Sequence, residues 1–189
     1  FISTCGNNDH PDIQLALLPS IVDNHTRNQH LGHGFTLHTT LMRPKSRGSV
    51  TLQSADPLQA PRIDPGFFTH PDDMAVALKG AQKGFEILLS KAMDSFRGKP
   101  LVPVDHSDPK ALEAYLRATC DTEYHPVGTC KMGPDSDPMA VVDAQLRVKG
   151  VQGLRVVDAC IMPALTSGNT NAPSMVIGEK AADLIRSGT

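Results

Sequence analysis

Tryptophan is absent from this 189-residue chain, tyrosine occurs only twice, and lysine and arginine nowhere gather into a dense run. The 18 basic and 20 acidic residues give a formal charge of −2, which is no electrostatic footprint for a phosphate backbone. No apolar run approaches the roughly 20 residues that a membrane helix needs. These absences exclude nucleic acid as an expected partner and favour a soluble chain.

The four cysteines form no CxxC pair, and a chain of this length does not need disulfides to fold. We therefore expect reduced thiols and a cytoplasmic location. The chain begins with phenylalanine, and its first residues lack the basic start and long apolar centre of a signal peptide. These features favour a piece of a longer chain.

The first third of the chain alternates short β-like runs with turn residues. The runs cover residues 12–22, 34–44 and 48–55, and antiparallel pairing is the simplest arrangement for them. Residues 43–48 contain proline, serine and glycine, which suits a tight connection between two such runs. Residues 56–65 contain three prolines, which favours an extended loop or an edge segment.

Helical patterns occupy the middle and the end of the chain. Apolar residues recur every three or four positions after Pro71 and predict a helix that begins there. Ser107 or Asp108 can cap a second helix, with Pro109 at its first position. Residues 172–188 predict a third helix, with one apolar face.

Residues 140–159 contain two more β-like runs, and Gly150 and Gly153 mark a turn between them. The chain thus has a β-rich first part with helices, followed by a β-turn-β-loop-helix tail. This order of elements favours an α+β fold.

Three histidines, His30, His33 and His38, cluster in the stretch HLGHGFTLH. A metal site needs a complete set of converging ligands, and no Cys, Asp or Glu lies nearby in the sequence to complete this one. We therefore expect a polar loop followed by a strand, and no metal. A metal-dependent hydrolase is the alternative, which tightly bound metal would support.

A different histidine, His125, lies in the stretch EYHPVGTCKMG. Pro126 biases His125 toward an extended backbone, and Gly128 allows another segment or a ligand to come close. Histidine suits proton transfer near neutral pH, because its free pKa is about 6.5. A catalytic histidine and a buried one with two hydrogen bonds fit this pattern equally well.

The stretch LTSGNTNAPSM (165–175) places five polar side chains just before the last helix. Capping by Asn171 or Thr170 explains one of them, which leaves the others without a structural reason. A helix N-terminus attracts electron-rich groups through its free N–H groups and its dipole. The pattern therefore predicts that this loop faces an oxygen-rich or anionic part of a cofactor.

Four long segments, in this order, resemble signatures of the glucose–methanol–choline (GMC) family of flavin oxidoreductases. They are RPKSRGSVTLQSADPLQAPRIDP (43–65), YHPVGTCKMG (124–133), VVDAQLRVKGVQGLRVVDACIMP (141–163) and SGNTNAPSMVIGEKAADLI (167–185). Four ordered motifs are far more specific than a single short pattern. The resemblance implies an enzyme that oxidises the CH–OH group of an alcohol, such as choline, with FAD as cofactor.

The resemblance also assigns roles to residues. It implies that His125 is the base, or the hydrogen-bond partner, for the substrate hydroxyl, and that Asn169 is the second active-site residue, which orients the hydroxyl. This His–Asn pair is similar to that of choline-type and alcohol dehydrogenase members. Asp158 and Ala159 match positions that contact the pyrophosphate and ribityl parts of FAD. The segment that approaches the flavin ring corresponds to Asn171, Ala172, Pro173 and Met175.

The dinucleotide fingerprint GxGxxG is absent, although the family carries one near the start of a much longer chain. The resemblance therefore implies the C-terminal portion of such a protein, whose N-terminal FAD-binding part is the missing partner. It implies a substrate-binding domain over 1–140, with an antiparallel sheet of up to six strands backed by helices. Residues 141–189 would be a strand-loop-helix tail that completes the FAD-binding domain.

Alone, such a fragment is expected to retain little or no FAD and to oxidise no alcohol. Its apolar tail helix could also pair with a second copy to form a dimer. The alternative to an enzyme fragment is a stand-alone, non-catalytic module for binding or assembly, derived from the family. A GxGxxG motif upstream in the reading frame would favour the enzyme. The resemblance leaves membrane association of the full-length protein open.

Overall fold

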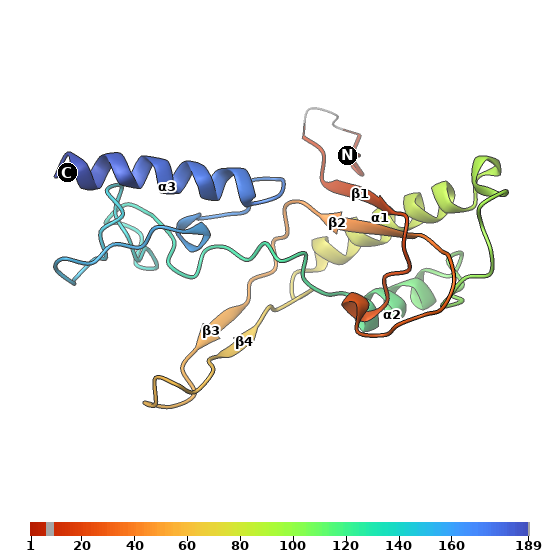
Figure 1. The fold of residues 1–189 in the computed structure, drawn as a ribbon, viewed down its shortest axis with the longest axis horizontal. Coiled ribbons are helices and arrows are strands. Elements are labelled where there is room, and N and C mark those ends of the chain that lie inside the picture. Colours follow the sequence, from red (N-terminus) through yellow and green to blue (C-terminus); the bar gives the residue numbers. More distant parts are fainter. Residues whose placement is uncertain (7–9, 189) are drawn as a thin grey trace. The chain divides into compact units, whose positions relative to one another are not determined.

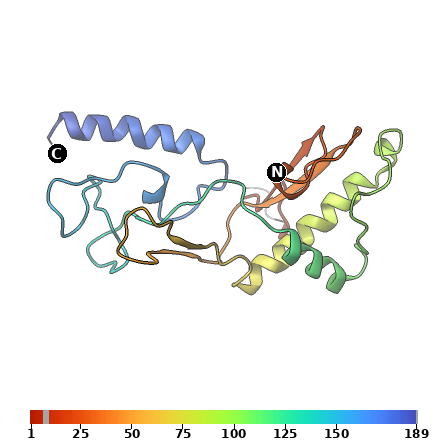
Figure 2. The same cartoon turned by 60° about the horizontal axis from the view of Figure 1, so that its bottom comes forward.

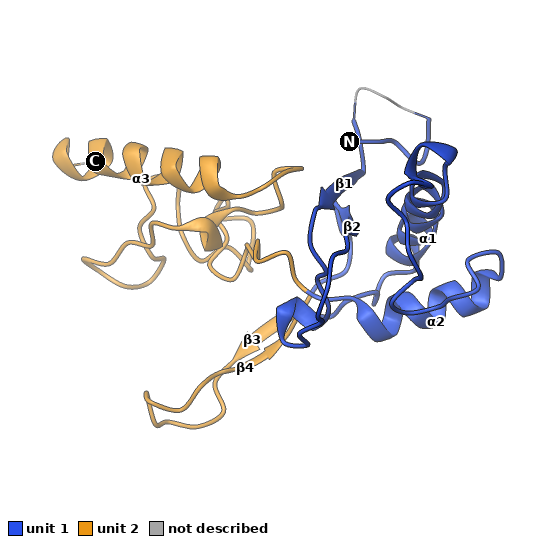
Figure 3. Ribbon diagram, turned by 45° about the vertical axis from the view of Figure 1, so that its right-hand side comes forward, with its two compact units in different colours: residues 1–47, 66–121 blue, residues 48–65, 122–189 orange. Residues whose placement is uncertain are grey.

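The structure is a computed structural model that describes residues 1–6 and 10–188. Their helices and strands follow one another as shown in Figure 1. The chain divides into two compact units, which Figure 3 shows in different colours. Unit 1 contains residues 1–47 and 66–121, and unit 2 contains residues 48–65 and 122–189. The predicted boundary near residue 140 concerns domains of a longer protein and stays a prediction.

Unit 1 is built on a two-stranded antiparallel sheet that lies against a helix (Figure 2). Strand β1 (Ile13–Leu18) pairs with β2 (Thr36–Leu41), and Ile13 lies opposite Leu41. The antiparallel pairing predicted for these two runs is confirmed. Ile13 is fully buried and packs on Gly80 of the helix, where an added Cβ would lie 2.9 Å from Ile13 Cδ1. The glycine thus lets the helix approach the sheet.

Two predicted helices of unit 1 are confirmed. Helix α1 (Pro71–Leu88) begins after His70, whose Nδ1 accepts a hydrogen bond from the Asp72 N–H, and it buries its small residues toward the sheet. Helix α2 (Pro109–Thr119) begins after Asp108, whose carboxylate accepts from the Lys110 N–H at 2.9 Å. Two short 3-10 turns, η1 (Asn24–Thr26) and η2 (Lys91–Met93), lie in the connections.

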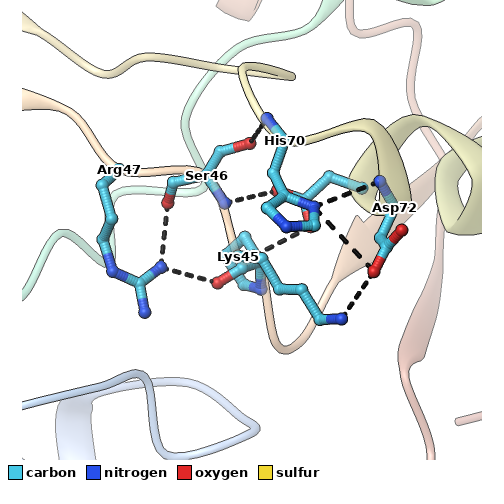
Figure 4. A network of polar contacts seen from close by, with 7 residues as sticks. Lys45, Ser46, Arg47, His70 and Asp72 are labelled. Carbon is cyan, nitrogen blue, oxygen red and sulfur yellow. Dashed lines mark hydrogen bonds and ion pairs between the residues drawn. The ribbon is translucent and has the colours of Figure 1, made fainter.

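The segment that leaves β2 is tied to the start of α1 by a polar network (Figure 4). At its centre is Asp73, which is only 4% exposed and accepts from the N–H groups of Lys45 at 2.8 Å and Ser46 at 2.7 Å. Ser46 Oγ in turn accepts from the His70 N–H at 3.0 Å. The sequence predicted that residues 43–48 form a tight connection between two paired strands. This prediction is wrong, because β2 pairs with β1, and the strand that follows residues 43–48 pairs with a later strand.

Replacement of Asp73 by asparagine should lower the free energy of unfolding by about 1–3 kcal/mol. An asparagine turns an NH₂ donor toward one of the two backbone donors and leaves that donor unsatisfied. Urea unfolding at pH 7 measures the loss. The exposed neighbour Asp72, which pairs with the Lys45 side chain, gives the matched control Asp72→Asn, with a much smaller effect.

The contribution of Asp73 also depends on pH. Burial alone would raise the pKa of Asp73, but the hydrogen bonds from Lys45 and Ser46 outweigh it and hold the pKa below its usual value. The stabilisation is thus complete above the unfolded pKa of about 3.9 and is lost as the pH falls through the folded pKa. Equal unfolding free energies for Asp73→Asn and the unchanged protein at pH 7 would contradict this role.

Unit 2 contains a second two-stranded antiparallel sheet. Strand β3 (Ser49–Thr51) pairs with β4 (Arg62–Asp64), and Val50 lies opposite Ile63. An added Cβ on Gly48 would lie 2.1 Å from the carbonyl oxygen of Asp64, so this backbone approach requires glycine. The α+β class is confirmed. The described residues form these two small sheets, and the sheet of up to six strands stays a prediction.

The rest of unit 2 packs around helix α3 (Asn171–Arg186), which confirms the third predicted helix. Its core is formed by Val142, Leu146, Ile161 and Ala181, and a short 3-10 turn, η3 (Ala159–Ile161), contributes the third of these. The two β-like runs predicted over 140–159 are wrong as strands. That region forms only single bridges: Val142 bridges to Met132 and to Val148, and Arg147 bridges to Arg155.

Among the described helices, none combines the length and apolar character needed to cross a membrane. On α3, the side chains of Met175, Val176 and Ile185 are 59%, 66% and 57% exposed, respectively, although the helix buries Ala181 in the core. Helix α3 therefore has apolar side chains both on the face that packs on the core of unit 2 and on the surface that is exposed in this chain.

Candidate active site

The loop that carries His125 has no regular secondary structure, and its backbone is held by the η3 region. The N–H groups of Gly128 and Cys130 both donate to the Cys160 carbonyl at 3.1 Å, and the Met132 N–H donates to the Ile161 carbonyl at 2.7 Å. Gly128 has a φ of +90°, which favours glycine. These three bonds join two segments that lie about 30 residues apart in the sequence.

The His125 side chain is half-buried, and its Nδ1 lies 3.0 Å from Thr170 Oγ1. Thr170 is the residue before α3 and is only 7% exposed. The hydrogen bond therefore connects the histidine loop to the helix start. This contact leaves the other ring nitrogen, Nε2, without a hydrogen bond among the described residues.

Asp158 precedes η3 and caps it, because its Oδ1 accepts from the Cys160 N–H at 2.7 Å. Hydrogen bonds from the Cys160 side chain and then from its backbone hold the pKa of Asp158 below its usual value. The exposed carboxylate is therefore ionised at neutral pH. Its neighbour Ala159, the first residue of η3, is half-buried.

The thiol of Cys130, in the histidine loop, lies within hydrogen-bonding distance of the Cys160 thiol. Burial, a hydrogen bond to Asp158 and the neighbouring Cys130 raise the pKa of Cys160 to about 12. This thiol stays protonated near neutral pH, and a protonated thiol is a poor nucleophile. The arrangement suits a packing residue.

The start of α3 presents unsatisfied backbone donors. Ser174 is the first residue whose N–H finds an acceptor within the helix, the Thr170 carbonyl at 3.0 Å. The N–H groups of Asn171 and Ala172 lie in the first turn and therefore have no intrahelical acceptor, and Pro173 has no N–H. The side chains of Asn171 and Ala172 are exposed. Such a helix start can bind a carbonyl or anionic oxygen.

All eight predicted site residues thus lie in unit 2, on the histidine loop, at η3 or around the start of α3. Asn169 is exposed and directly precedes Thr170, the partner of His125, while Pro173 is half-buried in the first turn of α3. Met175, in the next turn, is largely exposed. The role of the Thr170 hydroxyl was missed, because the sequence suggested a cap. The signal was Pro173, which removes one of the two N–H groups that such a cap could bind.

The histidine cluster in unit 1 has a different character. His30 Nε2 lies 2.7 Å from Asp23 Oδ2, an acidic neighbour that the sequence stretch itself does not contain. The hydrogen bond from His30 is the main reason that the pKa of Asp23 is below its usual value. His33 is exposed. Within residues 1–6 and 10–188, no three His, Cys, Asp or Glu side chains gather closely enough to hold a metal ion.

Comparison with known proteins shows the family of this chain. A family model described as GMC oxidoreductase matches residues 44–178. The chain therefore belongs to the GMC oxidoreductase family, as the four sequence motifs indicated. The match includes the histidine loop, η3 and the first half of α3.

Curated relatives are similar over nearly the whole chain. Mitochondrial choline dehydrogenase of Mus musculus is 46% identical over 178 residues, which cover 94% of this chain and 30% of that protein. Alcohol dehydrogenase [acceptor] of Pseudomonas putida is 41% identical over 188 residues, which cover 98% of this chain and 33% of that protein. The chain thus spans about a third of the length of these relatives.

Solved structures agree with this assignment. Pyridoxine 4-oxidase from Mesorbium loti superposes with a TM-score of 0.81 at 30% identity, over 92% of this chain and 34% of that one. A formate oxidase from Aspergillus oryzae, solved to follow FAD modification, gives a TM-score of 0.84 at 27% identity, over 94% and 32% of the two chains.

Proposed function

We propose that this chain is the C-terminal part of a flavin-dependent oxidoreductase that converts a primary alcohol, choline or another, into an aldehyde. The observation that carries the proposal is the 3.0 Å hydrogen bond between His125 and Thr170, because it brings the histidine loop to the start of α3. Family membership and the names of the curated relatives, a choline dehydrogenase and an alcohol dehydrogenase, support this class of reaction.

His125 would act as the base. Oxidation of a CH–OH group removes a proton from oxygen and a hydride from carbon, and bound FAD would supply the hydride acceptor. Since Thr170 engages Nδ1, the nitrogen that accepts the hydroxyl proton is Nε2. The half-buried ring limits the directions from which a substrate hydroxyl can approach.

Asn169 would orient the substrate hydroxyl. Its amide cannot titrate near neutral pH, so it cannot replace His125 as a base. Its NH₂ group can donate a hydrogen bond to the oxygen as negative charge develops there. The exposed side chain, next to the partner of His125, is available for this contact.

The residues assigned to FAD fit its chemistry. The free N–H groups of Asn171 and Ala172 suit the carbonyl oxygens of the flavin ring, and Pro173 and Met175 offer apolar surface beside them. The ionised Asp158 would repel a pyrophosphate, whereas it can accept hydrogen bonds from ribityl hydroxyls. We therefore assign Asp158 to the ribityl part and leave the pyrophosphate to backbone near Ala159.

The partner of this chain would be the FAD-binding part of the same protein. The relatives are about three times as long as the chain, and the exposed side chains of Met175, Val176 and Ile185 offer α3 a further packing surface. This proposal retains 141–189 as the tail that completes the FAD-binding domain. Pairing of two copies through the same surface is the alternative for the isolated chain.

A panel of primary alcohols, including choline, tests the proposed function in steady-state assays of the protein that carries this chain. We expect turnover of at least one alcohol, with aldehyde as the product and the flavin reduced. Residues 1–189 assayed alone should give no turnover and should lose flavin on gel filtration. No oxidation of any alcohol by the longer, flavin-loaded protein would overturn the proposal and favour a non-catalytic module.

A further inference from the structure

We infer that Thr170 is a positioning residue for His125, which fixes the orientation of the ring and keeps the lone pair of Nε2 available. This inference rests on the proposed role of His125 as a base. It starts from the bond between Thr170 Oγ1 and His125 Nδ1, which lies in a partly buried environment of unit 2. Thr170 would act through His125 and would not itself contact the substrate.

The local backbone explains why the Thr170 hydroxyl is free for this role. A threonine before a helix ordinarily has an extended backbone and accepts from the second or third N–H of the helix. Thr170 instead has helical φ and ψ of −85° and 0°, and its side chain makes no capping bond. The third helical residue is Pro173, which has no N–H to offer.

The carbonyl of Thr170 is fully engaged, which fixes the residue in place. It accepts from the Ser174 N–H at 3.0 Å and from the Ser174 hydroxyl at 2.7 Å. Since the Thr170 side chain is buried, loss of its bond to His125 would leave a polar group without a partner. The burial of Thr170 and the bonds to its carbonyl therefore hold its hydroxyl at a fixed position beside His125.

The role of His125 as a base requires that Nδ1 donates this hydrogen bond and Thr170 Oγ1 accepts it. A threonine hydroxyl can donate or accept, and neutral histidine carries its proton on one nitrogen only. If Thr170 donated to Nδ1, the proton of His125 would be on Nε2, and that nitrogen could not take another from a substrate. If Nδ1–H donates to Thr170 Oγ1, then Nε2 has a free lone pair.

The same bond persists through the proton transfer. As the O–H bond of the alcohol breaks and the Nε2–H bond forms, Nδ1 keeps its proton and still donates to Thr170 Oγ1. The ring therefore does not have to rotate or change partner when it becomes charged. Because a charged donor makes a stronger bond than a neutral one, Thr170 favours the protonated product of this step.

The test compares Thr170→Val with Thr170→Ser. Valine keeps the shape but removes the hydroxyl, whereas serine keeps the hydroxyl. We expect Thr170→Val to lower kcat about tenfold, the equivalent of one hydrogen bond, with little change in KM. Thr170→Ser should restore most of the rate. Thr119→Val removes a threonine hydroxyl from α2 in unit 1, where it donates to the Tyr115 carbonyl at 2.8 Å, and as the matched control it should leave kcat unchanged.

A readout without substrate separates this inference from the proposed function. In protein labelled with ¹⁵N-histidine, the ring nitrogens of His125 should report a proton on Nδ1, and Thr170→Val should shift the population toward the Nε2–H form. Folding of each variant is checked by circular dichroism. A His125 tautomer that is the same in Thr170→Val and the unchanged protein overturns the inference, even where the alcohol is oxidised. So does an equal loss of kcat in the valine and serine variants.

Discussion

Replacement of His125 by alanine should lower kcat/KM for the preferred alcohol by about 10²–10⁴-fold, the range that a positioned general base contributes. The loss should appear mainly in kcat, because His125 Nε2 acts when the hydroxyl proton is transferred. Flavin content should change little, since the residues assigned to FAD lie on η3 and the start of α3. Steady-state kinetics at saturating alcohol measure the effect.

Two further variants make this test specific. His125→Gln keeps a polar side chain that can bond to Thr170 but cannot take a proton at neutral pH, so it should lose nearly as much activity as alanine. His33→Ala removes an exposed histidine of unit 1 and should leave kcat/KM unchanged. If His125→Gln kept the rate of the unchanged protein, the ring would be a structural group and not the base.

Substitution of Asn169 by alanine should lower kcat by about 10²–10³-fold, or about 2.7–4 kcal/mol, as for other donors that face a developing oxyanion. The amide is exposed in this chain, so its loss should cost little stability. The combination of a large kinetic loss with an unchanged melting temperature is therefore the expected result. Rapid mixing under single-turnover conditions separates flavin reduction from later steps.

The exposed residue Asn28, in unit 1, gives a matched control for this amide. Its Nδ2 donates to Asp23 Oδ2 at 3.2 Å, and the residue lies far along the sequence from the histidine loop, so Asn28→Ala should leave kcat unchanged. An amide that only stabilises its loop would show the opposite pattern, with a lower melting temperature and nearly normal flavin reduction. That pattern in Asn169→Ala would remove this residue from the site.

The helices could be predicted from the sequence because their signals are local. Pro71 and Pro109 stand at first helical positions, next to side chains that cap the backbone. The runs at 140–159 have equally good β-like patterns, but no neighbouring segment pairs with them along their length. Pairing partners depend on distant parts of the chain, and a pattern within one run does not contain them.

The candidate site could be proposed from the sequence only in part, for the same reason. His125 and Asn169 stand out through their neighbours and through the family resemblance, so the sequence was enough to name them as candidates, and their roles stay a prediction. The bond between His125 and Thr170 spans 45 positions, and the shared acceptor at Cys160 spans about 30. Nothing in either stretch alone shows which hydroxyl or carbonyl it will meet.

The anchoring of the histidine loop through backbone atoms also affects how this protein can diverge. Almost any amino acid can supply the backbone carbonyl at position 160, and any residue except proline can supply the N–H at position 130. Substitution of either cysteine therefore need not displace His125. Gly128, with its φ of +90°, has no such freedom. Homologous chains can therefore replace the side chains of Cys130 and Cys160 while the backbone hydrogen bonds keep His125 in the same position.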